Sequence, residues 1–450
     1  MAVVNLPVEI VSEIGTYLSN HALASASLVC KSWRLATLPI LYYSIILGNN
    51  SRVERFSVSG CINSIQISPY VKKLAINLGG DGIDQSVLAL LEPWVPRLTQ
   101  LSELRWSLDY VPDNLQLVQL FQTKCSTISS VYVLFPEGRN FNSESVQIQF
   151  SLLLGFKNLV EFTLEIDEFA AGFEPNCARF LTSLLLNCPN LQSLALRFYD
   201  DDLQYSLDAL VASLNHEVTL PHLQKLQITG TVELDERTLF SPPGEGPHPF
   251  RDFLSRHPRI KDLELGCLVL KSYNGEINPY YFSLALPSLK SFECLDHICD
   301  QVIRSTVASR LETLIIREGS FEKGVDFLPD KVFGIRSLPK LRKLEIGTNA
   351  FDDAFEIMKA ILPGTEALEE LRITTVPHHC YHHAFLGLLT HTPKLRKLIM
   401  YNFGRSFMKA TASVFGFPQL QLPGDDEELS YEAQLKRKLR ILCPALEIIK

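Results

Sequence analysis

One short apolar phrase recurs through most of this chain. A chain with such a repeat must stack its units, because a unit of this size cannot bury its apolar face alone. Successive copies begin 22 to 37 residues apart, except for a last step of 51 residues to a partial copy at Leu446 and Ile449. The phrase has the form apolar-x-x-apolar-x-apolar, and its twelve complete copies begin at Val71, Leu101, Ile128, Leu159, Leu191, Leu223, Ile260, Leu289, Leu311, Leu341, Leu368 and Leu395.

The phrase predicts a short β-strand with one buried face. Its last three positions alternate apolar and variable residues, as in Leu226 and Ile228, and the first apolar residue fills the turn before the strand. Helix-like stretches such as Phe180 to Leu186 lie between the phrases. This order and a period near roughly 20–29 residues resemble leucine-rich repeats. The predicted fold class is therefore α/β, a horseshoe solenoid with a parallel β-sheet on its concave face.

Proline marks the entry to the predicted strands. It stands two residues before the phrase in seven of thirteen units, where the frequency of 25 prolines in 450 residues predicts about 0.7 cases. Proline ends the preceding helix and favours extended backbone, so its position fits a turn from helix to strand. The residues are Pro189, Pro221, Pro258, Pro287, Pro339, Pro393 and Pro444.

Residues 5–45 have a helical pattern instead. Pro7 suits the first turn of a helix, Ile10, Ile14 and Leu18 follow at four-residue steps, and Ser19 can cap a second helix. A third helix is expected to stop at Pro39. So few residues cannot bury three helices unaided, which predicts either a surface for a partner or a cap on the repeats. The residues expected at that surface are Leu6, Pro7, Val29, Cys30 and Trp33.

The same segment resembles the F-box. The likeness rests on Leu6-Pro7, Ile14, Leu18, Leu23 and the run Val29-Cys30-Lys31-x-Trp33-Arg34. It implies docking on the Skp-type adaptor of a cullin-based ubiquitin ligase. The expected adaptor-binding residues are Leu6, Pro7, Ile10, Ile14, Leu18, Leu23, Leu28, Val29, Cys30 and Trp33.

The repeats resemble those that accompany F-boxes. The sequence Asn-Cys-Pro-Asn-Leu-Gln-Ser-Leu at 187–194 carries this likeness, so the chain resembles the fungal-type F-box proteins with C-terminal leucine-rich repeats. The expected domains are a three-helix motif at 1–47 and a solenoid of about 12–13 units at 48–450. Residues 241–249 predict a surface excursion, and residues 428–442 a capping helix.

Composition excludes several functional classes. The net charge of −8 argues against a nucleic-acid binder or a binder of anionic membranes, which would carry a basic footprint. The N-terminus has no signal-peptide pattern, and no apolar run is long enough for a transmembrane helix. Ten cysteines without a C-x-x-C pair read as reduced, mostly buried thiols. The expected location is cytosol or nucleus.

No catalytic constellation is evident, so we do not expect an enzyme, a metal site or a cofactor. The cluster His378 to His383 contains pairs four residues apart, but it lacks H-E-x-x-H and is better explained as a solvated turn. Gly79 to Gly82 lacks the phosphate-loop pattern. The basic run Lys436 to Arg440 could be a nuclear address or a phosphate contact, and a solvated helix face explains it better.

Two functions remain open. The favoured one is a substrate receptor that brings a protein to the ligase, and the alternative is a ligase-independent interaction scaffold. A small molecule inside the horseshoe, as in some plant F-box receptors, follows from the resemblance alone. On the predicted concave face, four bases outnumber Glu345 and Glu370, which predicts a positive strip for an acidic or phosphorylated substrate. The substrate-binding candidates are Arg317, Lys343, Arg372, Lys397 and Tyr401.

Overall fold

The structure is a computed structural model that divides into two compact units. Unit 1 comprises residues 1–205 and 212–223, and unit 2 comprises residues 206–211 and 224–450. The described residues are 6–449 without 63–66, 78–82, 109, 111, 113–114, 136–142, 168–172, 200–204, 215–217, 243–245, 247, 271–277, 318–336, 349–350, 376–381, 401–436, 438, 440 and 442–445.

Unit 1 opens with three helices, as the pattern predicted. They are α1 (Val8–Thr16), α2 (Asn20–Ala26) and α3 (Lys31–Leu41), and both α1 and α2 pack against α3. The Ser19 side chain caps α2 by accepting a hydrogen bond of 3.3 Å from the backbone N–H of Ala22. Helix α3 runs two residues past Pro39, so the expected stop at this proline was wrong. Proline in the last turn removes only one backbone hydrogen bond, which the helix end tolerates.

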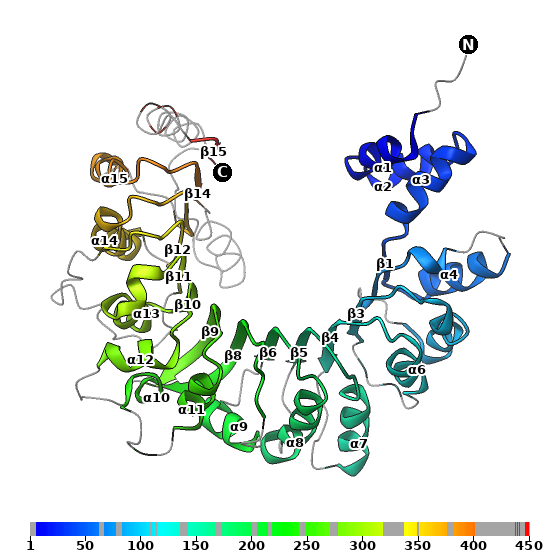
Figure 1. Ribbon diagram of the computed structural model, residues 1–450, viewed down its shortest axis with the longest axis horizontal. Helices are drawn as coiled ribbons and strands as arrows, with labels where there is room; N and C mark the ends of the chain where they lie inside the picture. Colours follow the sequence, from blue (N-terminus) through cyan, green and yellow to red (C-terminus); the bar gives the residue numbers. More distant parts are fainter. Residues whose placement is uncertain are drawn as a thin grey trace, which may run out of the picture. The chain divides into compact units, whose positions relative to one another are not determined.

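Parallel strands in the order β1-β2-β3-β4-β5-β6 form the rest of unit 1, with the helices on one side (Figure 1). The strands are β1 (Ser44–Leu47), β2 (Lys73–Asn77), β3 (Glu103–Ser107), β4 (Ser130–Phe135), β5 (Glu161–Asp167) and β6 (Ser193–Tyr199). The helices are α4 (Asn50–Ile62), α5 (Gln85–Leu88), α6 (Gln116–Lys124), α7 (Glu144–Leu153) and α8 (Phe173–Leu186), with 3₁₀-helices at Ser68–Tyr70, Ala89–Leu91 and Val95–Arg97. β7 (Tyr205–Ser206) and α9 (Leu207–Ser213) lie at the division between the units.

Unit 2 repeats the pattern with parallel strands in the order β8-β9-β10-β11-β12-β13-β14-β15. The strands are β8 (Lys225–Asp235), β9 (Asp262–Leu270), β10 (Ser291–Leu295), β11 (Thr313–Arg317), β12 (Lys343–Gly347), β13 (Glu370–Ile373), β14 (Lys397–Met400) and β15 (Ile448–Ile449). The helices are α10 (Glu236–Phe240), α11 (Pro249–Arg256), α12 (Pro279–Ala285), α13 (Asp296–Arg304), α14 (Phe351–Ile361) and α15 (His382–Leu389), with 3₁₀-helices at Thr306–Arg310 and Leu362–Gly364.

The repeat phrase forms the core, and the predicted fold class is confirmed as a leucine-rich-repeat solenoid. All apolar positions of the twelve complete phrases are buried except Met400, whose neighbour Ile399 is buried instead at 4% exposure. Strand alternation predicts Ile399 on the exposed face in register with Arg372, so its burial was not expected. The structure also adds β1 before the first phrase, where only the helical motif was expected.

Several predictions fall outside the described residues. These are the turn at 79–82, most of the histidine cluster at 378–383, Tyr401, and the capping helix at 428–442 apart from Arg437, Leu439 and Ile441. Those three residues have helical backbone, and Leu439 is fully buried.

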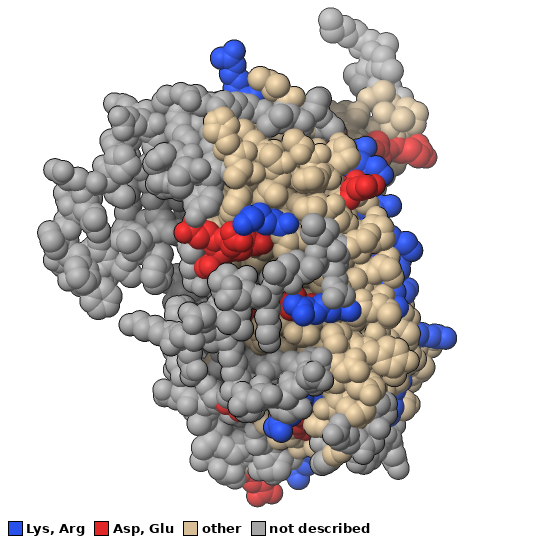
Figure 2. All heavy atoms as spheres, turned by 90° about the vertical axis from the view of Figure 1, so that its left-hand side faces the viewer, with Lys and Arg blue, Asp and Glu red and all other residues tan. Residues whose placement is uncertain are grey.

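The outer side of unit 2 carries its helices. Figure 2 shows charged side chains of both signs lying close together on this side, among larger uncharged areas. On α14, for example, Lys359 Nζ lies 2.9 Å from Glu356 Oε1. Among the described residues, none of the helices combines the length and apolar character needed to span a membrane. The same residues contain no cluster of three His, Cys, Asp or Glu that could hold a metal ion.

Candidate functional site

The N-terminal helices leave an apolar surface exposed. Val11, Gly15 and Leu23 are buried among the helices, so Ile10 and Ile14, one turn apart, face away from that core on α1. We call the most exposed large apolar residues of these helices the N-terminal apolar surface. They are Leu6, Val8, Ile10, Ile14, Tyr17, Leu28, Val29 and Leu35, with exposures from 37% to 81%.

Most of the predicted adaptor-binding residues are accessible. Leu6, Pro7, Ile10, Ile14, Leu28, Val29 and Cys30 are exposed. Leu18 and Trp33 are half-buried, so each has one side in the helical core and one side available. Leu23 is 2% exposed and packs inside the domain, so it can affect a partner only by holding the helices in place.

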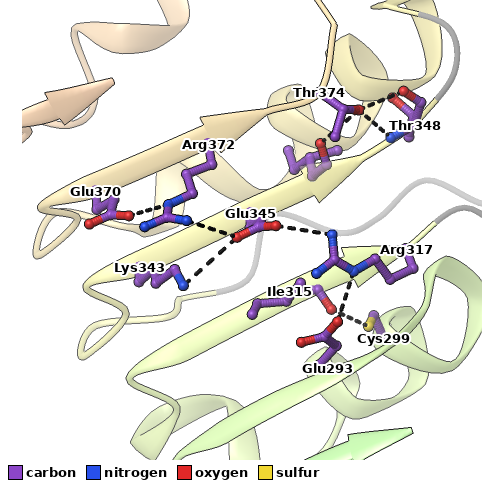
Figure 3. A network of polar contacts seen from close by, with 11 residues as sticks. Glu293, Cys299, Ile315, Arg317, Lys343, Glu345, Thr348, Glu370, Arg372 and Thr374 are labelled. Atoms are coloured by element: carbon purple, nitrogen blue, oxygen red, sulfur yellow. Dashed lines mark hydrogen bonds and ion pairs between the residues drawn. The ribbon is translucent and has the colours of Figure 1, made fainter. Parts of the chain in front are cut away.

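A second candidate surface lies on the strand face of unit 2 that is opposite the buried leucines. Figure 3 shows its charged side chains, which form a ladder across neighbouring strands. Arg317 on β11 joins Glu293 on β10 (Nε to Oε1, 2.8 Å) to Glu345 on β12 (Nη1 to Oε1, 3.0 Å). Glu345 Oε2 also lies 3.8 Å from Lys343 Nζ and 3.9 Å from Arg372 Nη1. The ladder therefore connects four successive strands.

Glu370 on β13 extends the ladder to β14. Its carboxylate contacts Arg372, and its Oε2 lies 3.2 Å from Lys397 Nζ. Burial would raise the pKa of Glu370, but the hydrogen bonds from Arg372 and Lys397 outweigh it and hold the pKa below its ordinary value. For Arg317, burial would lower the pKa, and the carboxylates of Glu293 and Glu345 raise it instead.

These contacts change the meaning of the predicted positive strip. Each of Arg317, Lys343, Arg372 and Lys397 already has a carboxylate partner in the ladder. The sequence analysis counted only Glu345 and Glu370 on this face. Glu293 on β10 also belongs to the ladder, so four bases face three acids. The strip is thus close to neutral, and a substrate anion would have to compete with internal partners for every base.

The ladder should contribute to stability through Glu345, which contacts three cations and is only 14% exposed. Glu345→Gln is expected to lower the free energy of unfolding by about 1–2 kcal/mol, between the values for exposed and buried pairs. Urea denaturation at low salt measures this loss, which should shrink in 1 M salt.

Glu369→Gln is the matched control for this substitution. Glu369 directly precedes β13 and is 44% exposed, and its Oε1 lies 3.9 Å from Arg342 Nε, so its loss should cost less than about 0.5 kcal/mol. Equal effects of the two substitutions would show that the ladder adds nothing beyond ordinary surface pairs.

The strand face of unit 1 holds a contact that sequence reasoning missed. The guanidinium of Arg105 on β3 lies over the ring of Tyr132 on β4, with 4.2 Å from its carbon to the ring centroid. The Tyr132 hydroxyl donates a hydrogen bond of 2.8 Å to Glu165 Oε2 on β5. Arg197 Nη1 on β6 lies 3.4 Å from the same oxygen. Four successive strands thus contribute to one polar row.

Comparison with known proteins bears on the N-terminal helices. The F-box-like family model matches residues 3–47. A comparison with curated proteins found no match. Among solved structures, a chain from the Rad7 and Elc1 complex in yeast is similar at 16% identity over 92% of this chain and 90% of that chain, with a TM-score of 0.40. A protein from Bacteroides fragilis is similar at 14% identity over 67% of this chain and 75% of that chain, with a TM-score of 0.34.

Neither structural likeness reaches a TM-score of 0.5, so the two carry no information on function. The family match and the three helices agree on the same segment, which ends where β1 ends. Residues 3–47 of this chain are therefore an F-box-like domain, and the chain joins that domain to a leucine-rich-repeat solenoid.

Proposed function

We propose that this chain is the substrate-recognition subunit of an SCF-type (Skp-cullin-F-box) ubiquitin ligase. The F-box-like domain docks on a Skp-type adaptor, and the repeats hold a protein substrate. The exposed N-terminal apolar surface carries this proposal, because a folded domain rarely leaves so many large apolar side chains in water without a partner. Leu28 and Val29 are the strongest case, at 78% and 67% exposure.

In this role the chain does no bond chemistry itself. It acts in the cytosol or nucleus by holding substrate and ligase together, which raises the effective concentration of the substrate near the transferred ubiquitin. The solenoid suits this role because its strands present a long row of side chains, such as the ladder from Glu293 to Lys397, to a partner.

Co-expression of the full chain with a Skp-type adaptor tests the proposal. The adaptor should co-purify with the chain in equal amount and stay bound through gel filtration. The complex of chain and adaptor should then bind the cullin. The adaptor without this chain is the control, and it should bind the cullin as well. A folded chain that retains no adaptor would contradict the proposal and favour the ligase-independent scaffold.

A further inference from the structure

One arginine on the strand face differs from every other base in the described strands. These strands contain eight lysines and arginines, and seven of them form an ion pair with a carboxylate: Lys73, Arg197, Lys225, Arg317, Lys343, Arg372 and Lys397. Arg105 has no carboxylate within ion-pair distance among the described residues, and it is exposed. Its guanidinium rests on the ring of Tyr132 instead.

The fold holds this pair in place. Tyr132 is half-buried, and its hydroxyl is tied to Glu165 Oε2 at 2.8 Å. Burial, with the hydrogen bond to Glu165, raises the pKa of Tyr132 to about 12, so the hydroxyl remains a donor at neutral pH. The ring therefore offers a fixed surface to the guanidinium. Arg105 is ordered by stacking on this ring and by a side-chain hydrogen bond with Tyr132. Its exposed guanidinium carries further N–H donors that an anion can use.

The neighbouring positions in register carry small side chains. Ala75 on β2 is aligned with Arg105, and Thr163 on β5 is aligned with Tyr132. Both side chains are small, so Arg105 and Tyr132 lie between small neighbours in this row. Arginine and tyrosine are also the residue types that contribute most of the binding energy in protein interfaces.

We propose that Arg105, stacked on Tyr132, binds an aspartate or glutamate side chain of the protein that the repeats hold. This inference rests on the proposed function for the holding role. A guanidinium–carboxylate contact can use the Arg105 donors that do not face Tyr132. The neighbouring bases are already paired, Lys73 with Glu103 and Arg197 with Glu165, so Arg105 is the base that can take an added carboxylate.

That charge balance favours a carboxylate over a phosphate. Lys73, Arg105 and Arg197 face Glu103, Glu161 and Glu165 on these strands, so the charges balance, and Arg105 is the base without an ion pair among the described residues. A phosphate with nearly two negative charges would lack a second cation and would lie near Glu103 on the same strand and Glu165. A single carboxylate meets neither problem.

An array of synthetic ten-residue peptides tests the assignment. Each peptide varies one position among Glu, Gln, Lys and phosphoserine, and the full chain is the probe. The wild-type chain should retain Glu peptides at least tenfold better than their Gln counterparts, as expected for one charge-assisted hydrogen-bonded pair. Arg105→Gln should lose this discrimination, and Arg105→Glu should prefer Lys at the same position. Arg97→Gln is the matched control and should behave like the wild-type chain, because Arg97 is also exposed and stacked on an aromatic ring, that of Trp94 at 5.2 Å, but lies outside the strands.

Three results would overturn the assignment. They are a tenfold preference for phosphoserine over Glu, equal loss of discrimination in the Arg97→Gln and Arg105→Gln chains, and no peptide retained by the wild-type chain. Adaptor binding is measured on the same preparations. A chain that discriminates Glu from Gln but binds no adaptor would refute the proposed function and leave the Arg105 site intact.

Discussion

Replacing both Leu28 and Val29 with aspartate is expected to weaken adaptor binding by at least about 100-fold. The two side chains are 78% and 67% exposed in the free chain, so the change should leave its folding untouched. In the complex, the same positions would bury two carboxylates in an apolar interface, which costs several kcal/mol unless each finds a partner. Calorimetric titration of the purified chain with a Skp-type adaptor measures the loss.

A matched pair of substitutions separates this effect from a general effect of surface charge. Ile148 on α7 and Leu284 on α12 are 52% and 50% exposed and lie outside the F-box-like domain. Their double replacement with aspartate should leave adaptor affinity unchanged. Undiminished binding by the Leu28/Val29 variant would place the adaptor elsewhere. Trp33 is a poorer target, because it is half-buried and its loss would also disturb the domain.

The fold could be predicted from the sequence because three apolar positions in each phrase mark the buried residues of its strand and of the turn before it. Alternation predicted which residues are buried, since strand side chains point alternately to opposite faces. The rule failed at the ends of the array. At β1, Ile45 and Leu47 are aligned with Leu74 and Ile76, but residues 1–47 had been assigned to the helical motif. At β14, Met400 is half-buried, and Ile399 is buried although it is aligned with Arg372.

The candidate site was less readable, because its chemistry depends on pairs between strands. The charge count treated Lys343, Glu370 and Lys397 as separate exposed residues. They occupy the same position of successive phrases, each 27 residues apart, and the structure pairs Lys343 with Glu370 and Glu370 with Lys397 in register. Alignment of the phrases would have shown opposite charges side by side.

The same alignment contains the signal for Arg105. Its counterparts in the neighbouring phrases are Ala75 and Tyr132, and neither is acidic. Alignment could therefore have shown that Arg105 lacks a carboxylate in register. It could not have shown that the guanidinium lies on the tyrosine ring, because that depends on side-chain conformations and on the hydrogen bond to Glu165.

Leu226→Ala should produce the largest loss of stability among the predicted substitutions. Leu226 is the central apolar residue of its phrase, 1% exposed on β8 and aligned with Leu263 on β9. Truncation to alanine removes buried apolar contacts and leaves a cavity, so the free energy of unfolding should fall by about 2–5 kcal/mol. Chemical denaturation followed by circular dichroism measures this change. Leu284→Ala is the control, because that side chain is half exposed and its loss should cost less than about 1 kcal/mol.

The Leu226→Ala substitution should also show where in the chain unfolding begins. In a solenoid each repeat contacts only its neighbours, so the loss at Leu226 should first open the strands beside β8 rather than the whole chain. Hydrogen exchange should therefore accelerate first in β8 and β9, and the F-box-like domain should keep its protection and its adaptor affinity. If exchange instead rose equally in α1 to α3, the chain would unfold as one cooperative body. If Leu226→Ala cost no more than Leu284→Ala, the assignment of Leu226 to the buried face would be wrong.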